Sequence, residues 1–155
     1  MIKYLVMDVD GTLTDGKIYI GENGEIMKAF NAKDGMGISK IAKDNSITPI
    51  ILTGRKSKIV ENRCLELGIT ELYQGINDKV AKIKEILDDL GEVAYIGDDL
   101  NDLPVMIAVQ SSGGIIGSPS DAAEEVKRIC DYCCKARGGE GCVREFIEWI
   151  VFGNG

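Results

Sequence analysis

Short apolar runs alternate with longer amphipathic segments along this chain. The runs at 4–9, 49–52 and 93–96 are apolar, β-prone and as long as buried strands. Between them, apolar residues recur at helical spacing, most clearly at 78–90, where Gly91 follows the last turn. Strands that alternate with helices are typical of right-handed crossovers, and therefore of a mainly parallel sheet with helices on both faces.

The remaining segments complete this pattern. The Asn-Gly pair in the loop 21–24 predicts a β-hairpin with strands at 17–20 and 26–30. Further strands are expected at 71–73 and 114–116, and helices at 35–44, 57–67, 101–108, 120–127 and 142–152. We therefore expect an α/β fold with a three-layer, doubly wound, Rossmann-like and mainly parallel sheet. It forms one domain, 1–155, with a small β-hairpin flap at about 17–30.

Chemically versatile side chains follow three of these strands. Asp8 and Asp10 close the first strand, Thr53 follows the second, and Asp98 follows the third. Ligands of open α/β sheets bind at the carboxyl ends of the strands, so these side chains are expected to meet in one crevice. There, one acid of the Asp8/Asp10 pair can act as a nucleophile while the other gives and takes protons. Taken alone, the Asp-x-Asp-Gly stretch also suits a solvated turn.

The amino-acid composition of the chain excludes several classes of function. Hydrophobic residues make up 45% of the 155 positions and charged residues 28%, which is ordinary for a water-soluble domain. No apolar run approaches a membrane span and no secretory cleavage pattern is present, so we expect a cytoplasmic protein without a membrane partner. A net charge of −7 argues against nucleic acid as a partner. The absence of histidine excludes Ser-His-Asp and Cys-His catalysis and histidine-ligated metal sites.

The cysteines are unevenly distributed, because four of the five fall between 130 and 142. They are Cys64, Cys130, Cys133, Cys134 and Cys142. Reduced thiols are expected, since the count is odd and no secretion signal is visible. The spacing matches no standard metal motif, and two interpretations stay open: a metal or Fe–S site, or small buried hydrophobes.

The segment DVDGTLT, which begins at Asp8, resembles the first motif of the haloacid dehalogenase-like phosphatases. Three more motifs follow in the order of that family: Thr53 resembles the second-motif Ser/Thr, Lys79 the third-motif Lys, and the stretch GDDLND the acidic fourth motif. The resemblance implies that Asp8 attacks phosphorus to form an aspartyl-phosphate, with Asp10 as general acid and base. Thr53 and Lys79 would neutralise charge on the transferring group.

The resemblance also implies magnesium as the cofactor. Mg2+ prefers oxygen ligands and would neutralise the dianionic phosphate that otherwise repels the Asp8 carboxylate. Asp8, a main-chain carbonyl at Asp10, and Asp98 would hold the ion with several waters, whereas Asp99 and Asp102 would brace the loop. Without the partner motifs, the same acids would suit a helix N-cap. A dehalogenase of the same superfamily lacks the second acid, so Asp10 favours phosphate chemistry.

No cap domain fits into this sequence, because the stretches between the motifs are too short. The flap or a neighbouring subunit would shield the site instead, and the resemblance implies a homo-oligomer, a tetramer. Within the capless group, the chain is similar to phosphatases of 3-deoxy-D-manno-octulosonate 8-phosphate, a small phosphorylated sugar acid of lipopolysaccharide synthesis. The substrate-binding residues that this implies are Asp10, Asn31, Ala32, Lys33, Asp34, Gly35, Gly54, Arg55, Arg63 and Lys79.

Two positions depart from this subgroup. Lys33 and Ser39 stand where arginine is usual, and lysine lacks the two-pronged geometry of a guanidinium. A sister group acts on nine-carbon, sialic-acid-type phosphates, but it typically has Glu where this chain has Arg55. A third interpretation is a catalytically silent subunit that supports a sugar-nucleotide transferase, which the intact Asp8/Asp10 pair disfavours.

The glycine-rich segment 137–141 admits two interpretations. It reaches into the site of a neighbouring subunit, where Arg137 or Arg144 contacts substrate, or it caps the last helix. Both interpretations of this segment stay open. Arginine forks suit the carboxylate and the phosphate of a sugar acid, which agrees with the substrate contacts implied for Arg55 and Arg63.

Overall fold

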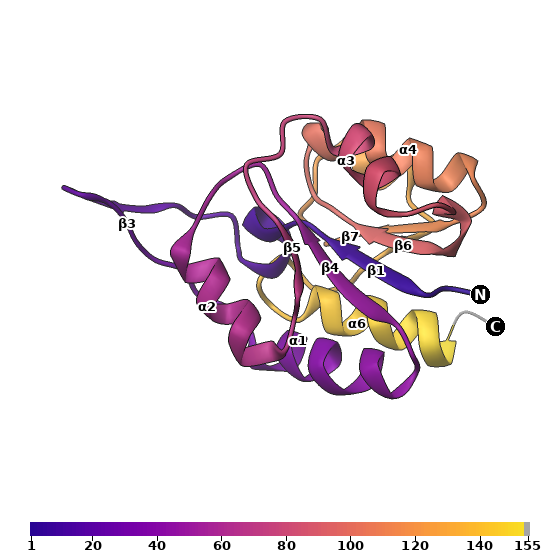
Figure 1. The fold of residues 1–155 in the computed structure, drawn as a ribbon, viewed down its shortest axis with the longest axis horizontal. Helices are drawn as coiled ribbons and strands as arrows, with labels where there is room; N and C mark the ends of the chain where they lie inside the picture. The colour runs from indigo at the N-terminus through magenta and orange to yellow at the C-terminus, as the bar shows by residue number, and fades with distance from the viewer. Residues whose placement is uncertain (154–155) are drawn as a thin grey trace.

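Six parallel strands form the central sheet of residues 1–153, the part of the chain that the computed structural model describes (Figure 1). The strands are β1 (Tyr4–Met7), β4 (Thr48–Leu52), β5 (Glu71–Tyr73), β6 (Val93–Ile96), β7 (Ile115–Ser118) and β8 (Tyr132–Cys133). Their order across the sheet is β5-β4-β1-β6-β7-β8. Tyr4 of the central strand is opposite Thr48 on one side and Val93 on the other. The direction of winding reverses at β1, which confirms the predicted doubly wound architecture.

Helices cover both faces of the sheet because β1 is apolar on both. Leu5 and Met7 face one side and Val6 the other, and all three are completely buried. The helices of the first face are α1 (Ala32–Met36) with its continuation, α2 (Lys58–Leu67) and α6 (Cys142–Glu148). Those of the second face are α3 (Lys79–Ile86), α4 (Leu103–Ser111) and α5 (Glu124–Ile129). In Figure 1, α1 and α6 lie below the sheet and α3 and α4 above it.

Two helices continue as π-helical segments. α1 runs on through Gly37–Ala42, and α6 through Trp149–Gly153. Asn31 caps α1, because its side-chain oxygen accepts hydrogen bonds from the backbone N–H groups of Lys33 (2.8 Å) and Asp34 (3.4 Å). This cap explains why the helix begins before its predicted start at 35. In the described part of the chain, no helix is long and apolar enough to cross a membrane.

The helix predicted at 78–90 is shorter than expected. α3 ends at Ile86, and Leu87 has extended backbone angles, φ −129° and ψ 134°. Asp89 then accepts a hydrogen bond from the backbone N–H of Gly91 at 2.8 Å and starts a 3₁₀ turn, which competes with a continued helix. The apolar spacing correctly predicts burial of Leu87 and Leu90, but an extended segment and a 3₁₀ turn bury them.

Two further elements differ from the sequence prediction. β8 has no counterpart there, because two residues are too few to show a periodic pattern; parallel pairing with β7 holds it in place. The helix expected at 120–127 lies at Glu124–Ile129. The residues after Pro119 first form a turn, in which the backbone N–H of Ala122 donates to the Pro119 carbonyl at 3.2 Å.

The hairpin flap projects from the body of the domain (Figure 1). β2 (Tyr19–Gly21) pairs antiparallel with β3 (Gly24–Met27), as the Asn-Gly pair predicts. Four apolar side chains on or next to these strands are exposed: Ile18, Ile20, Ile26 and Met27. An exposed apolar patch on a hairpin is typical of a contact with another molecule.

The five cysteines are free thiols. Three of them are buried in the core, where they pack as small hydrophobes: Cys64, Cys134 and Cys142. Cys130 is half-buried and Cys133 is exposed. Among residues 1–153, the one group of three side chains close enough to share a metal ion contains no cysteine. The interpretation as buried hydrophobes therefore accounts for three of the five.

Candidate active site

A polar cleft opens at the carboxyl ends of β1, β4 and β6, where the winding of the sheet reverses. The residues that line it follow these three strands: Asp8, Asp10, Thr53, Gly54, Arg55, Asp99 and Asn101. The first five are candidates from the sequence, and the structure brings them together from distant segments. Asp99 and Asn101 are additions to the cleft lining that the motif pattern does not assign to substrate.

The turn after β1 lets two acids approach each other. Asp8 keeps an extended backbone at the end of the strand, and Gly11 then adopts φ +93°, which residues with a side chain rarely adopt. A Cβ atom at Gly11 would overlap the carboxylate of Asp98. The backbone N–H groups of Gly11 and Gly16 donate to the Thr14 hydroxyl at 3.2 and 3.1 Å and close the turn. Glycine is therefore required at position 11 for Asp98 to come near Asp8.

Lys79 is buried beside Asp8. Asp78 caps α3 by accepting a hydrogen bond from the backbone N–H of Ala81 at 2.9 Å, which fixes Lys79 as the first helical residue. The Lys79 ammonium lies 3.2 Å from Asp8 Oδ1 and 2.8 Å from Asp102 Oδ1. Burial alone would lower the pKa of Lys79, but the two carboxylates raise it above its ordinary value. Lys79 therefore stays charged and partly compensates the acids around it.

Asp102 braces the acidic loop after β6. Its carboxylate is fully buried and accepts hydrogen bonds from the Tyr95 hydroxyl at 2.6 Å and from the backbone N–H groups of Asp98 and Asp99 at 3.0 and 3.2 Å. With the Lys79 contact, these bonds engage both of its oxygens. Sequence reasoning missed Tyr95, because it lies inside an apolar strand and no spacing pattern links it to Asp102.

The carboxylates of Asp8, Asp98 and Asp102 form an oxygen-rich site that suits a cation. One oxygen of each lies within 4.8 Å of the others. Burial, and then repulsion by the neighbouring acids, raises the pKa of both Asp8 and Asp98 above the ordinary value of a carboxyl. A divalent cation would remove this repulsion, and carboxylate oxygens are ligands that Mg2+ prefers. Because Asp102 is engaged by its own donors, Asp8 and Asp98 are best placed to hold the ion.

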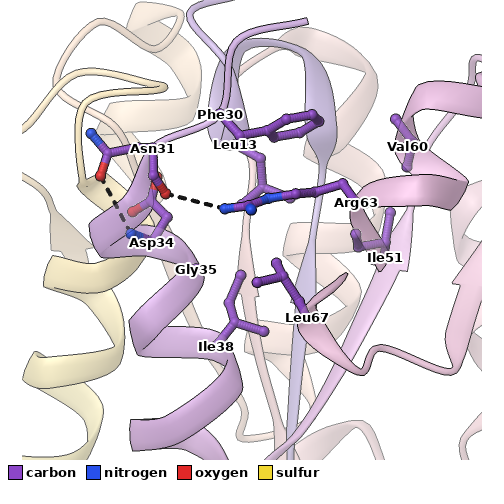
Figure 2. Close-up of a pocket in the computed structure, with 10 residues that line it drawn as sticks. All are labelled: Leu13, Phe30, Asn31, Asp34, Gly35, Ile38, Ile51, Val60, Arg63 and Leu67. Carbon is purple, nitrogen blue, oxygen red and sulfur yellow. Dashed lines mark hydrogen bonds between the residues drawn. The ribbon is translucent and has the colours of Figure 1, made fainter. Parts of the chain in front are cut away.

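The other predicted substrate-binding residues belong to α1, its N-cap and α2, and four of them are drawn in Figure 2. These four line a narrow pocket, together with apolar side chains: Asn31, Asp34, Gly35 and Arg63. The Arg63 guanidinium lies 5.4 Å from the centroid of the Phe30 ring and donates to the Asn31 carbonyl at 3.5 Å. Ala32 and Lys33 are exposed on the first turn of α1. This group does not line the cleft beside the strand ends, and its role in substrate binding stays a prediction.

Asp34 joins α1 to α6 in the interior. It is only 2% exposed, and its Oδ1 accepts a hydrogen bond from the backbone N–H of Arg144 at 2.9 Å, in the first turn of α6. Since Gly141 at the start of α6 offers no side-chain cap, Asp34 supplies the acceptor. Its Oδ2 is buried without a hydrogen-bond partner among the described residues. Burial raises the pKa of Asp34 to about 6.

Replacing Asp34 by asparagine is expected to change how stability depends on pH. In the folded protein Asp34 takes up a proton near pH 6, and in the unfolded chain near 3.8, so its charge destabilises the fold as the pH rises through 6. The unfolding free energy of Asp34→Asn, relative to the parent protein, should be greater at pH 8 than at pH 5 by about 1–2 kcal/mol. Urea denaturation at both pH values measures this difference, and a pH-independent difference would contradict the assigned pKa.

The glycine-rich segment packs against the turn after β1. The backbone N–H of Gly139 donates to the Thr12 carbonyl at 3.1 Å, and the Cys142 thiol donates to the same carbonyl at 3.2 Å. A Cβ atom at Gly138 would overlap the carbonyl of Gly11, so this close approach requires glycine. The segment therefore supports the turn that carries the first-motif acids.

The two arginines of this region have partners within the chain. Arg137 lies 3.5 Å from Asp121, and Arg144 lies 2.5 Å from Glu148. Arg144 also donates to the carbonyl of Lys33 at 3.3 Å. A structural role next to the last helix accounts for these contacts, and an arginine contact with the substrate of a neighbouring subunit stays a prediction.

The sequence matches no family model, but it is similar to curated proteins and solved structures. The 3-deoxy-D-manno-octulosonate 8-phosphate phosphatase KdsC of Escherichia coli K12 is 44% identical, over 99% of this chain and 81% of the relative. A Moraxella catarrhalis structure of that phosphatase, in complex with magnesium ion, phosphate ion and KDO, has a TM-score of 0.87 at 38% identity, over 98% of this chain and 87% of that one.

A third similarity links the chain to the wider superfamily. A Legionella pneumophila hydrolase assigned to the HAD superfamily, subfamily III A, has a TM-score of 0.88 at 36% identity, over 98% of this chain and 83% of that one. Identity at this level over nearly the whole chain goes beyond a shared fold, and it agrees with the four sequence motifs. The chain therefore belongs to the 3-deoxy-D-manno-octulosonate 8-phosphate phosphatase family of the haloacid dehalogenase-like (HAD) superfamily.

Proposed function

We propose that this protein is a Mg2+-dependent phosphatase that hydrolyses 3-deoxy-D-manno-octulosonate 8-phosphate through an aspartyl-phosphate. The observation that carries this proposal is the position of Asp8, which is buried between the Lys79 ammonium and the Asp98 carboxylate and reaches the cleft beside Asp10. The E. coli and M. catarrhalis relatives bear the name of this activity, and the second is in complex with magnesium, phosphate and the sugar acid. An all-oxygen cluster at the cleft agrees with that chemistry.

Each side chain has its own task in the proposed reaction. The Asp8 carboxylate attacks phosphorus in line while the bond from phosphorus to the sugar oxygen breaks. Asp10 gives a proton to the departing oxygen and later takes one from the water that hydrolyses the aspartyl-phosphate. The Lys79 ammonium and the Thr53 hydroxyl stabilise negative charge on the transferring group. Asp8, Asp98 and the main-chain carbonyl of Asp10 would hold Mg2+, which supplies charge neutralisation for the phosphate when bound.

Arg55 is the cleft residue that we assign to the sugar acid. Its side chain is 51% exposed, and its Nε lies 3.8 Å from Asp10 Oδ2. A guanidinium binds a carboxylate with two parallel hydrogen bonds. Arg55→Ala is expected to raise KM for the sugar acid phosphate about tenfold or more, and to affect p-nitrophenyl phosphate less, because that ester has no carboxylate. Steady-state kinetics with both esters measure this, and equal changes would deny Arg55 a part in sugar recognition.

We also infer that the protein is a homo-oligomer, and the family resemblance implies a tetramer. We further propose that it is located in the cytoplasm. Exposed apolar side chains of the flap such as Ile20 and Ile26 support a contact with a second copy, which would shield the cleft in place of a cap domain. The five free cysteines support a reducing compartment. Light scattering of the purified protein measures the number of copies.

A panel of phosphate esters, with released phosphate as the readout, tests the proposed function. It comprises 3-deoxy-D-manno-octulosonate 8-phosphate, a nine-carbon sialic-acid-type phosphate and simple sugar phosphates, each with Mg2+ and with excess chelator. We expect the highest kcat/KM for the eight-carbon ester, no turnover in chelator, and recovery when Mg2+ is restored. Turnover that persists in chelator would exclude the metal role. A preference for the nine-carbon ester would assign the sister substrate, and no turnover of any ester would favour a silent subunit.

A further inference from the structure

A buried lysine next to the flap contacts the proposed general acid. Lys28 follows β3 directly, and its side chain is only 2% exposed. Its ammonium lies 2.5 Å from Asp10 Oδ1 and 2.8 Å from Glu25 Oε1. Because removing an ammonium from water is costly, a buried lysine needs close carboxylate partners, and Lys28 has two. None of the four sequence motifs includes Lys28 or Glu25.

Glu25 extends this contact to the segment after β4. Its Oε2 accepts a hydrogen bond from the Ser57 hydroxyl at 2.7 Å. The same hydroxyl accepts a hydrogen bond from the backbone N–H of Val60 at 3.3 Å and caps α2. The flap is thus joined at Asp10 to the turn after β1, and at Ser57 to the start of α2. Asp10, Lys28, Glu25 and Ser57 form one polar network, which we call the flap network.

Lys28 divides the two oxygens of Asp10 between two tasks. Oδ1 is engaged by Lys28, whereas Oδ2 is on the side of Arg55, which lines the cleft. Oδ2 is therefore the oxygen that can give a proton to a departing group in the cleft. As that proton leaves, negative charge develops on Asp10. An ammonium bonded to Oδ1 stabilises the resulting carboxylate more strongly than it stabilises the neutral carboxyl.

We propose that Lys28 is a positioning residue for proton transfer by Asp10. Because Lys28 also contacts Glu25 of the flap, this transfer then depends on how firmly the flap is held against the turn after β1. The inference rests on the proposed function, since it requires Asp10 to act as an acid. The proton moves from Asp10 Oδ2 to the departing alkoxide as the phosphorus–oxygen bond breaks, and Lys28 keeps its own protons. A leaving group that is already stable as an anion, such as p-nitrophenolate, does not need this proton.

The test is the dependence of kcat/KM on the leaving group, measured with Mg2+ for the parent and for Lys28→Met. This parameter covers the steps up to release of the first product, and so isolates the acid role of Asp10 from its later role as a base. For alkyl and sugar phosphates, Lys28→Met should lower kcat/KM about 10²-fold, whereas for p-nitrophenyl phosphate the loss should stay within about threefold. Lys28→Arg, which keeps a cationic donor, should restore most of the lost activity.

Two comparisons separate positioning from a merely structural role. Lys17→Met removes an exposed lysine before the first flap strand and should leave both classes of ester unaffected. Hydrogen exchange of the backbone amides of residues 17–30 reports how firmly the flap is held against the turn after β1 in each variant. An equal loss for alkyl and aryl esters in Lys28→Met, with or without faster exchange, would overturn the inference. So would full alkyl ester activity in this variant.

The outcomes remain distinguishable from failure of the proposed function. If the parent protein releases no phosphate from any ester in Mg2+, the proposed function fails before Lys28 is tested. If the parent is active and Lys28→Met does not fold, Lys28→Gln carries the same series, because it keeps a donor and removes only the charge. A leaving-group dependence in Lys28→Gln identical to that of the parent would then refute the role of the Lys28 charge.

Discussion

Asp8→Asn is expected to abolish phosphatase activity, with kcat lower by about 10⁴-fold or more. An amide is neutral and a far weaker nucleophile than a carboxylate, so the aspartyl-phosphate does not form at useful rates. Asp10 is not expected to replace it, because Asp10 lacks the contact with Lys79 that Asp8 makes. Released phosphate, measured with the sugar acid phosphate and with p-nitrophenyl phosphate, should fall for both esters. Activity within about tenfold of the parent would refute the nucleophile assignment.

The same variant is expected to be at least as stable as the parent protein. Burial, and then the charge of Asp102, raises the pKa of Asp8 above its ordinary value, so at higher pH the charged Asp8 destabilises the fold. Asparagine removes that cost and keeps the shape of the side chain. Thermal unfolding at pH 8 in chelator measures the effect. Asp44→Asn is the matched control, because this acid is 59% exposed and lies on the surface.

Lys79→Met is expected to reduce both activity and stability. The variant leaves Asp8 and Asp102 buried without their shared cation, and removing one partner of a buried ion pair costs about 3–5 kcal/mol. Activity should fall about 10²–10³-fold, because the transferring phosphoryl group loses a fixed positive charge. Methionine retains a long apolar stem, so the start of α3 should still pack against the sheet.

Magnesium separates the two effects of this variant. In Lys79→Met, the buried carboxylates of Asp8 and Asp102 repel each other without a cation between them. Mg2+ held by Asp8 and Asp98 would neutralise part of this repulsion, so it should restore stability more than it restores activity. Thermal unfolding in Mg2+ and in chelator measures the first, and phosphate release the second. Lys84→Met, an exposed change on the same helix, serves as the control. An unchanged melting temperature for Lys79→Met in chelator would contradict the buried ion pair.

The residues at the strand ends were predictable because their positions depend on short-range pattern. Apolar runs mark where strands end, and parallel strands end at one edge of a sheet, so Asp8, Thr53 and Asp98 had to come close together. The partners of these residues were not predictable in the same way. The Tyr95 hydroxyl is hidden in an apolar strand, and Lys28 resembles a solvated residue in the sequence because its contact with Asp10 is 18 positions away.

Asp34 illustrates a second limit of sequence reasoning. Its neighbours in the chain resemble a substrate-binding segment, but its carboxylate binds the backbone of Arg144, 110 positions away. A local pattern carries no information about a contact of that separation. The end of α3 was missed for a different reason, because helical spacing of Leu87 and Leu90 persists where Asp89 forms its own turn.

The contact between Gly138 and Gly11 bears on when a newly made chain becomes functional. The first-motif acids leave the ribosome well before the glycine-rich segment that supports their turn. A nascent chain that ends before position 138 contains Asp8 and Asp10, yet lacks the backbone that packs against the turn that follows them. Such a fragment would not hold these acids in place, so hydrolytic activity is expected only after residues 138–142 have been made.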